Sequence, residues 1–111
     1  MATLTKQVVT LAGQELSVAA AAAGGDQFLN SGKDFLLVRN GHADTARTVT
    51  INSQLACSYG SDHDIAVVCA AQKDTMIGPF PKNRFNNTTG YVLITYSDSA
   101  ANLSVAVIEV A

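Results

Sequence analysis

The chain has 111 residues, of which 48% are apolar and only 14% are charged. That length suits one domain around a single core, and we expect residues 1–111 to form one. The net charge is −2 and Lys and Arg form no cluster, which argues against nucleic acid or a membrane as the main partner. So small a charged fraction predicts that further copies of the chain or a partner cover part of the surface.

The N-terminal residues lack the basic region and apolar core of a secretory signal peptide. We therefore expect the chain to be made in a cytoplasm-like compartment, where Cys57 and Cys69 stay free thiols. A disulfide between them is the alternative. The apolar run at 19–23 is too short and too weakly hydrophobic to span a bilayer.

The first predicted strand is 6–13, within an N-terminal segment, 1–23, that is either a strand or an arm. The alanine-rich run 17–27 predicts a strand of small residues where another backbone approaches closely. One helical turn is the alternative, because Gly24 and Gly25 would end a helix at once.

Further strands are predicted at 34–40, 47–52, 64–71, 75–78, 90–97 and 102–110, each bounded by turn residues. Strand 75–78 is expected to pair back on 64–71 through the turn between them. Turn residues recur about every ten positions, a spacing typical of an antiparallel all-β sandwich or barrel.

Two patterns predict where particular strands lie. In 47–52, Val49 and Ile51 share one face while the threonines at 48 and 50 share the other, so this strand has one wet face. Residues 64–71 and 92–94 are apolar on both faces. We expect these two strands to be central in a sheet or covered by a partner.

The segment 57–64, CSYGSDHD, holds the candidates for catalysis or metal binding: Cys57, Ser58, Asp62, His63 and Asp64. A nucleophile needs a base oriented by a third group, and a divalent metal accepts carboxylate and imidazole ligands. These residue types also form turns, so we predict neither a catalytic nor a metal site and no cofactor. His42 is expected to be a solvated turn residue.

Carbohydrate binding is the alternative function, since sugar sites on β-sandwiches stack rings on exposed aromatic side chains. The chain has no Trp, and Tyr59, Tyr91 and Tyr96 are its tyrosines. Tyr91 and Tyr96 are expected on opposite faces of one strand, so at most one of them joins a binding platform.

The segment GPFPKNRF, residues 78–85, is predicted to be a structural corner. Pro79 and Pro81 cannot donate to a sheet ladder, so they end strand 75–78 and shield its edge. Phe80 and Phe85 are expected to pack beneath the loop and close one end of the sandwich. Arg84 either braces loop carbonyls or contacts a partner.

The order GGDQFLNSGKDFLLVRNG, TVTI, HDIAVVCAA, IGPFPKNRFNN, GYVLITYS and LSVAVIEV resembles small β-sandwich proteins encoded near the major capsid protein of tailed bacteriophages. The resemblance covers the chain from about Gly24 onward. It implies a jelly-roll cement or decoration protein, like the staple protein of epsilon15-like phages, on the outer surface of the virion. Its partner would be the phage major capsid protein.

Composition and resemblance together lead us to expect a small symmetric oligomer, a homodimer before a homotrimer. The candidate partner-binding residues are Leu4, Val8, Val9 and Arg84. The arm 3–10 is expected to be free to add a strand to a neighbour.

Overall fold

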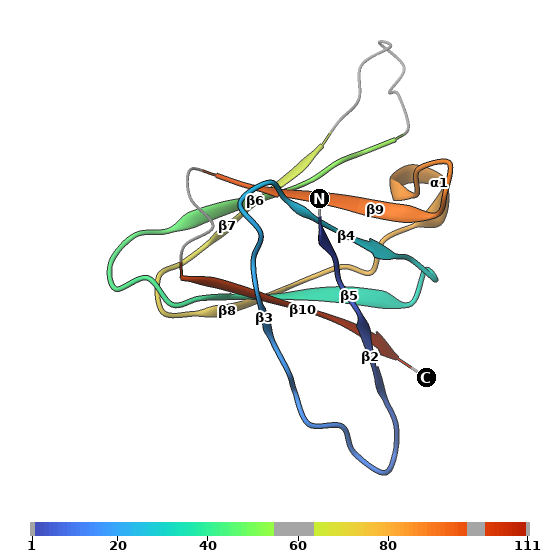
Figure 1. Ribbon diagram of the computed structural model, residues 1–111, viewed down its shortest axis with the longest axis horizontal. Coiled ribbons are helices and arrows are strands. Elements are labelled where there is room, and N and C mark those ends of the chain that lie inside the picture. Colours follow the sequence, from blue (N-terminus) through green and yellow to red (C-terminus); the bar gives the residue numbers. More distant parts are fainter. Residues whose placement is uncertain (1, 55–63, 98–101, 111) are drawn as a thin grey trace.

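The computed structural model describes residues 2–54, 64–97 and 102–110, which fold into two β-sheets packed face to face (Figure 1). The first, sheet A, has the strand order β1 (Ala2–Thr3), β4 (Asp26–Leu29), β9 (Tyr91–Tyr96), β6 (Arg47–Ile51) and β7 (Ile65–Cys69). The second, sheet B, has the order β2 (Lys6–Val9), β10 (Leu103–Val110), β5 (Asp34–Asn40) and β8 (Asp74–Ile77), with β3 (Ala19–Ala20) also on β10. The predicted all-β sandwich is confirmed.

The main core lies between the sheets and follows from the period-two alternation of each strand. Val49 and Ile51 are fully buried, while Thr48 and Thr50 on the other face of β6 are only partly covered, as predicted. The buried apolar side chains that meet from both sheets include Phe28, Leu36, Val38, Val49, Ile51, Val92, Ile94, Leu103, Val105 and Val107.

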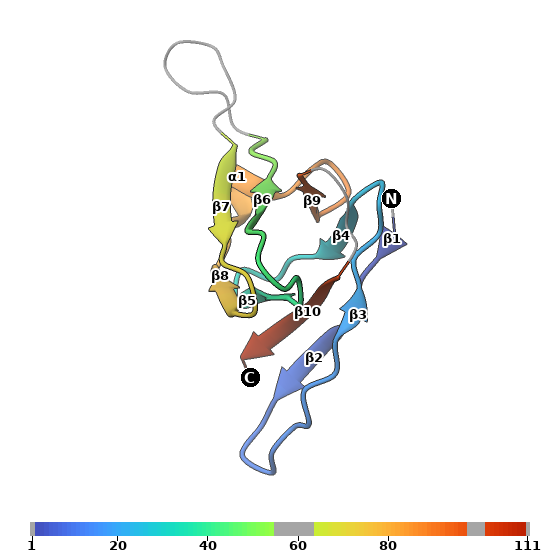
Figure 2. The same cartoon turned by 90° about the vertical axis from the view of Figure 1, so that its left-hand side faces the viewer.

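The N-terminal segment departs from the expected antiparallel arrangement. β1 runs parallel to β4, and β2 runs parallel to β10, so both sheets are mixed. Figure 2 shows this segment passing from one sheet to the other along one side of the sandwich. The expectation of a free arm at 3–10 is therefore wrong: its backbone already pairs within the chain, where it satisfies an edge of β10 that would otherwise lack partners.

The alanine run forms a strand and not a helical turn. Ala19 and Ala20 pair antiparallel with Val105 and Ser104 on the same edge of β10 that binds β2 further along. β2 and β3 together therefore cover this edge of sheet B.

The pairing expected for 75–78 is wrong. β8 pairs with β5 and not with β7, because the connection after β7 carries the chain across to the other sheet. There the Asn40 N–H donates to the Lys73 carbonyl at 3.1 Å, which extends the β5–β8 ladder.

The two strands that are apolar on both faces have different positions. β9, which contains 92–94, lies in the middle of sheet A, as one alternative predicted. β7 is instead the edge strand of sheet A. The expected central position is therefore wrong for β7. The other expectation, that a partner covers this strand, stays a prediction.

Candidate functional site

The outer face of sheet B carries a continuous surface that we call the apolar band. It consists of Val9, Leu16, Val18, Phe35, Leu37, Met76, Ala106, Ile108 and Val110. Phe35 joins its parts, since it packs on the buried Leu37, Ala106 and Ile108, and also lines the two hollows on either side. The band exists because residues 35–37 and 106–110 place apolar side chains on the outer as well as the inner face of the sheet.

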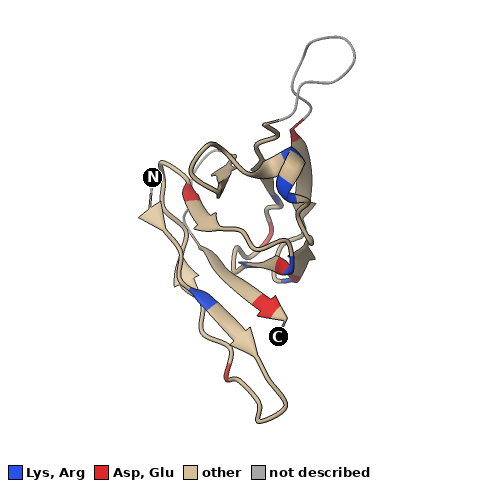
Figure 3. Ribbon diagram, turned by 90° about the vertical axis from the view of Figure 1, so that its right-hand side faces the viewer, with Lys and Arg blue, Asp and Glu red and all other residues tan. Residues whose placement is uncertain are grey.

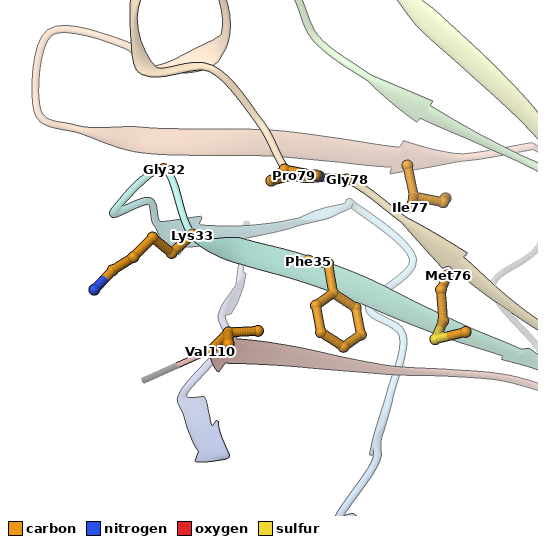
Figure 4. Close-up of a pocket in the computed structure, with 8 residues that line it drawn as sticks. All are labelled: Gly32, Lys33, Phe35, Met76, Ile77, Gly78, Pro79 and Val110. Atoms are coloured by element: carbon orange, nitrogen blue, oxygen red, sulfur yellow. The ribbon is translucent and has the colours of Figure 1, made fainter. Parts of the chain in front are cut away.

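The larger hollow, of about 490 Å³, lies between the ends of three strands. Phe35 from β5, Met76 from β8 and Val110 from β10 line it, with Pro79 at its border (Figure 4). Lys33 is its one charged lining residue, and Figure 4 shows that its side chain extends away from Phe35. The hollow therefore suits an apolar group.

The backbone at Gly78 shapes this hollow. Its φ is 131°, and a Cβ there would lie 3.1 Å from the Phe35 Cα. A side chain at position 78 would be strained and would press on β5 beneath it. The glycine therefore lets the chain turn away from β8 directly behind Phe35.

Residues 6–18, which are called the arm from here on, border the other end of the apolar band. Val8 and Val9 are 41% and 43% exposed, and Leu11 at its turn is fully exposed. The arm is held in shape by the Gln7 side chain, which accepts from the Ser17 N–H at 2.9 Å and donates to the Ser17 carbonyl. Leu16 and Val9 then line a smaller hollow of about 150 Å³ beside Ile108.

One ion-pair cluster fixes the start of the arm to the body. The Lys6 ammonium lies 3.5 Å from an Asp34 carboxylate oxygen and 3.7 Å from a Glu109 carboxylate oxygen. The Asp34 side chain is fully buried and also accepts from the N–H and hydroxyl of Ser31. Lys6 thus offsets a buried negative charge where β2, β5 and β10 meet.

Charged residues are few along this part of the chain, as Figure 3 shows for the side of the molecule that carries β2 and the end of β10. On the outer face of β5 and β8, Arg39 and Asp74 pair across the strands at 3.0 Å. The Arg39 guanidinium lowers the pKa of the Asp74 carboxyl, so this pair stays ionised at neutral pH. The rest of the band is apolar.

The segment 78–85 packs as a corner of the core. Phe80 and Phe85 are buried and their rings lie edge to face with centroids 5.6 Å apart, while Phe80 also contacts Phe28. The Asn30 side chain donates to the Phe80 carbonyl at 2.9 Å. Residues Lys82–Phe85 form one helical turn, α1, that the sequence analysis did not predict.

Arg84 and the prolines have separate places in this corner. The Arg84 guanidinium lies 4.9 Å from the centre of the Phe85 ring. The backbone carbonyl of Arg84 accepts from the Gln54 N–H at 2.7 Å. Pro81 directly precedes α1, and Pro79 lines the larger hollow. Arg84 therefore takes part in the corner's own packing.

The other predicted site residues do not gather in one place. Leu4 packs against the main core, so it is not an exposed contact, whereas Val8 and Val9 are. Cys57, Ser58, Tyr59, Asp62 and His63 lie outside the described residues. Asp64 accepts from the Ser53 N–H at 2.9 Å and so has a structural role.

The remaining candidates are also bound within the fold. The Tyr96 hydroxyl donates to the Asp26 carboxylate at 2.5 Å, and Tyr91 is half-buried on the other face of β9. The His42 side chain is partly covered, and the backbone N–H of His42 donates to the Asn40 side chain. Within residues 2–54, 64–97 and 102–110, no group of three His, Cys, Asp or Glu side chains could hold a metal ion.

Sequence reasoning missed Phe35, Met76 and Val110. A signal for Phe35 was present, because the four consecutive apolar residues 35–38 cannot all face one side of a strand. The exposed position of Met76 depends on the pairing of β8 with β5, which the sequence pattern did not predict.

Comparisons of the chain with protein-family models, curated proteins and solved structures found no match. No helix in the described parts of the chain is long and apolar enough to cross a membrane.

Proposed function

We propose that the protein is a structural protein of a phage head, which binds the outside of an icosahedral shell and clasps neighbouring major capsid subunits. The apolar band is the observation that carries this proposal. Its exposed members, Met76, Val110, Leu16 and Val9, lie on one face of a small sandwich, and grouped exposed apolar side chains of this kind mark a protein-binding face.

The apolar band would meet the shell through packing rather than charge. The cross-strand ion pair beside the band, Arg39 with Asp74, is internally neutral, and the chain's net charge is only −2. Exposed charges are screened within about 10 Å at 0.1 M salt, so attachment by this surface depends little on ionic strength. Of the two exposed valines of the arm, Val9 belongs to this surface, whereas Val8 lies on the opposite face of β2.

The test adds the purified protein to bare shells of the parent phage, at low salt and near 0.5 M salt. We expect saturable binding that barely weakens with salt, and shells that withstand higher temperatures once coated. Binding that vanishes with salt would point to electrostatic docking, and no binding would remove the proposal.

A pair of substitutions locates the binding surface. Met76→Asp puts a carboxylate on the apolar band, where Met76 is 70% exposed, and should abolish shell binding. Leu29→Asp is the matched control, since Leu29 is 50% exposed on sheet A and the charge change is the same. Equal losses for both variants would show that the band is not the contact surface.

Carbohydrate binding gains no specific support from the larger hollow. Its lining residues, apart from Lys33, are apolar or glycine, so they offer a sugar few side-chain hydrogen-bond partners. A glycan array should therefore show no binding. A saturable signal that Met76→Asp abolishes would replace the capsid proposal with a sugar-binding one.

A further inference from the structure

Strand β7 is an uncharged sheet edge. Its five residues, Ile65–Cys69, contain no charged side chain and no proline, and Val68 is 67% exposed. Natural proteins usually guard such an edge with charges, prolines or bulges, because its backbone groups can pair with another strand. Among the described residues, only β6 forms a ladder with β7.

The other sheet edges are guarded. β8 carries the Arg39–Asp74 ion pair and is followed by Pro79. β2 carries Lys6, and the Gln7 side chain ties it to Ser17 on the returning limb of the arm. β1 and β3 are each only two residues long. β7 is therefore the edge that offers the longest unguarded backbone.

The hydrogen bonds of β6 show which backbone groups of β7 point outward. The Asn52 N–H donates to the Leu93 carbonyl and the Ser97 N–H donates to the Thr48 carbonyl, so alternate residues of β6 face β9. Val49 and Ile51 then face β7, where they lie opposite Val67 and Ile65. By the same alternation, the N–H and carbonyl groups of Ala66 and Val68 point away from the sheet.

We propose that the β7 strands of two copies of this chain pair antiparallel about a two-fold axis through Val67. Ala66 of each copy exchanges its backbone hydrogen bonds with Val68 of the other, so that two copies of sheet A form one continuous sheet. Such an interface uses the same patch on both copies and closes at two. It accounts for the apolar character of both faces of β7.

The geometry suits a second copy because pairing meets no like charge within the strand. The charged residue that directly precedes β7, Asp64, is turned back onto its own chain by bonds to the Ser53 N–H and the Asn52 side chain. Across the axis the small Ala66 lies opposite the larger Val68, so the exposed face packs without two bulky side chains opposed. The proposal is independent of shell binding, because it concerns the protein alone in solution.

The test measures the molar mass of the purified protein over a concentration series by sedimentation. We expect a dimer that Val68→Lys weakens about tenfold or more, because it sets a cation beside the edge of each copy. Thr95→Lys is the matched control: Thr95 is exposed on the same face, but on the central strand β9. A monomeric wild-type protein, or equal dimers for both variants, would overturn the proposal.

A second variant tests the position of the axis. In the proposed register Val67 lies directly opposite its own copy, within the Cα distance that a disulfide spans. Val67→Cys should therefore form a covalent dimer on oxidation, whereas Thr95→Cys and the wild-type protein, which share Cys57 and Cys69, should not. A covalent dimer from Thr95→Cys but not from Val67→Cys would place the contact elsewhere and overturn the pairing.

Discussion

At the scale of single residues, the corner at 78–85 depends on its phenylalanines more than on its arginine. Phe85 is buried against Phe80, so Phe85→Ala should leave a cavity and cost about 3–5 kcal/mol of unfolding free energy. Arg84→Ala loses the contact over the Phe85 ring but leaves no buried cavity, and should cost about 1 kcal/mol. Urea denaturation of both variants measures the difference. Small and equal losses would contradict the packing of Phe85.

Tyr96 donates a hydrogen bond to one oxygen of a buried carboxylate. Its hydroxyl donates to Asp26, which is 1% exposed and otherwise accepts from the Ala22 N–H. Tyr96→Phe should therefore cost about 1–3 kcal/mol, because Asp26 stays buried with one donor fewer. Tyr91→Phe, on the outward face of the same strand, should cost under about 0.5 kcal/mol. Denaturation midpoints that fall equally would contradict the role of the bond.

Tyr96 and Cys69 should make the free energy of unfolding fall at alkaline pH. Burial raises the pKa of the Cys69 thiol above its usual 9.0, and burial together with Asp26 raises the pKa of Tyr96 above its usual 10.0. The folded state thus keeps protons that the unfolded chain releases. Their contribution is fully present below about pH 9 and is lost as pH rises further. The urea midpoint should fall above that pH, and Tyr96→Phe should reduce the fall above about pH 10. A midpoint that stays constant up to about pH 11 would contradict both shifts.

At the scale of elements, the attachment of β2 depends on Lys6. Lys6→Met removes the cation beside the buried Asp34. Because the carboxylate then stays buried without this partner, we expect a loss of about 3 kcal/mol in the free energy of unfolding. We expect the amide protons of β2 to exchange faster by a larger factor than those of β9. Hydrogen exchange followed by mass spectrometry measures both. Equal changes in the two strands would show that the pair stabilises the whole fold and not the arm.

Strand identity was predictable from the sequence where one face is wet and the other buried, as in β6. Strand pairing was not predictable, because it depends on strands that are distant in the sequence. β8 pairs with β5 and not with β7, and β2 of the N-terminal segment runs parallel to β10. The apolar band follows from that pairing. Phe35, Met76 and Val110 come from three strands, and no local pattern shows that they meet.

For the whole molecule, the two proposed surfaces are separate: the apolar band is the outer face of sheet B, whereas β7 is an edge of sheet A. Substitutions should therefore separate their functions. Met76→Asp should abolish shell binding and leave the dimer intact. Val68→Lys, at concentrations where its weakened dimer has dissociated, should still bind shells through the band.

The monomer should bind shells more weakly, because a dimer that engages two capsid sites gains avidity. Linking two sites raises apparent affinity by about a hundredfold or more without any new contact. We therefore expect Val68→Lys to saturate the same number of shell sites as the wild-type protein, with a dissociation constant about a hundredfold higher. Thr95→Lys should behave as wild type, since it adds the same charge away from the edge. Unchanged affinity for a monomeric Val68→Lys would show that each copy binds the shell alone, and that clasping neighbouring subunits does not depend on the dimer.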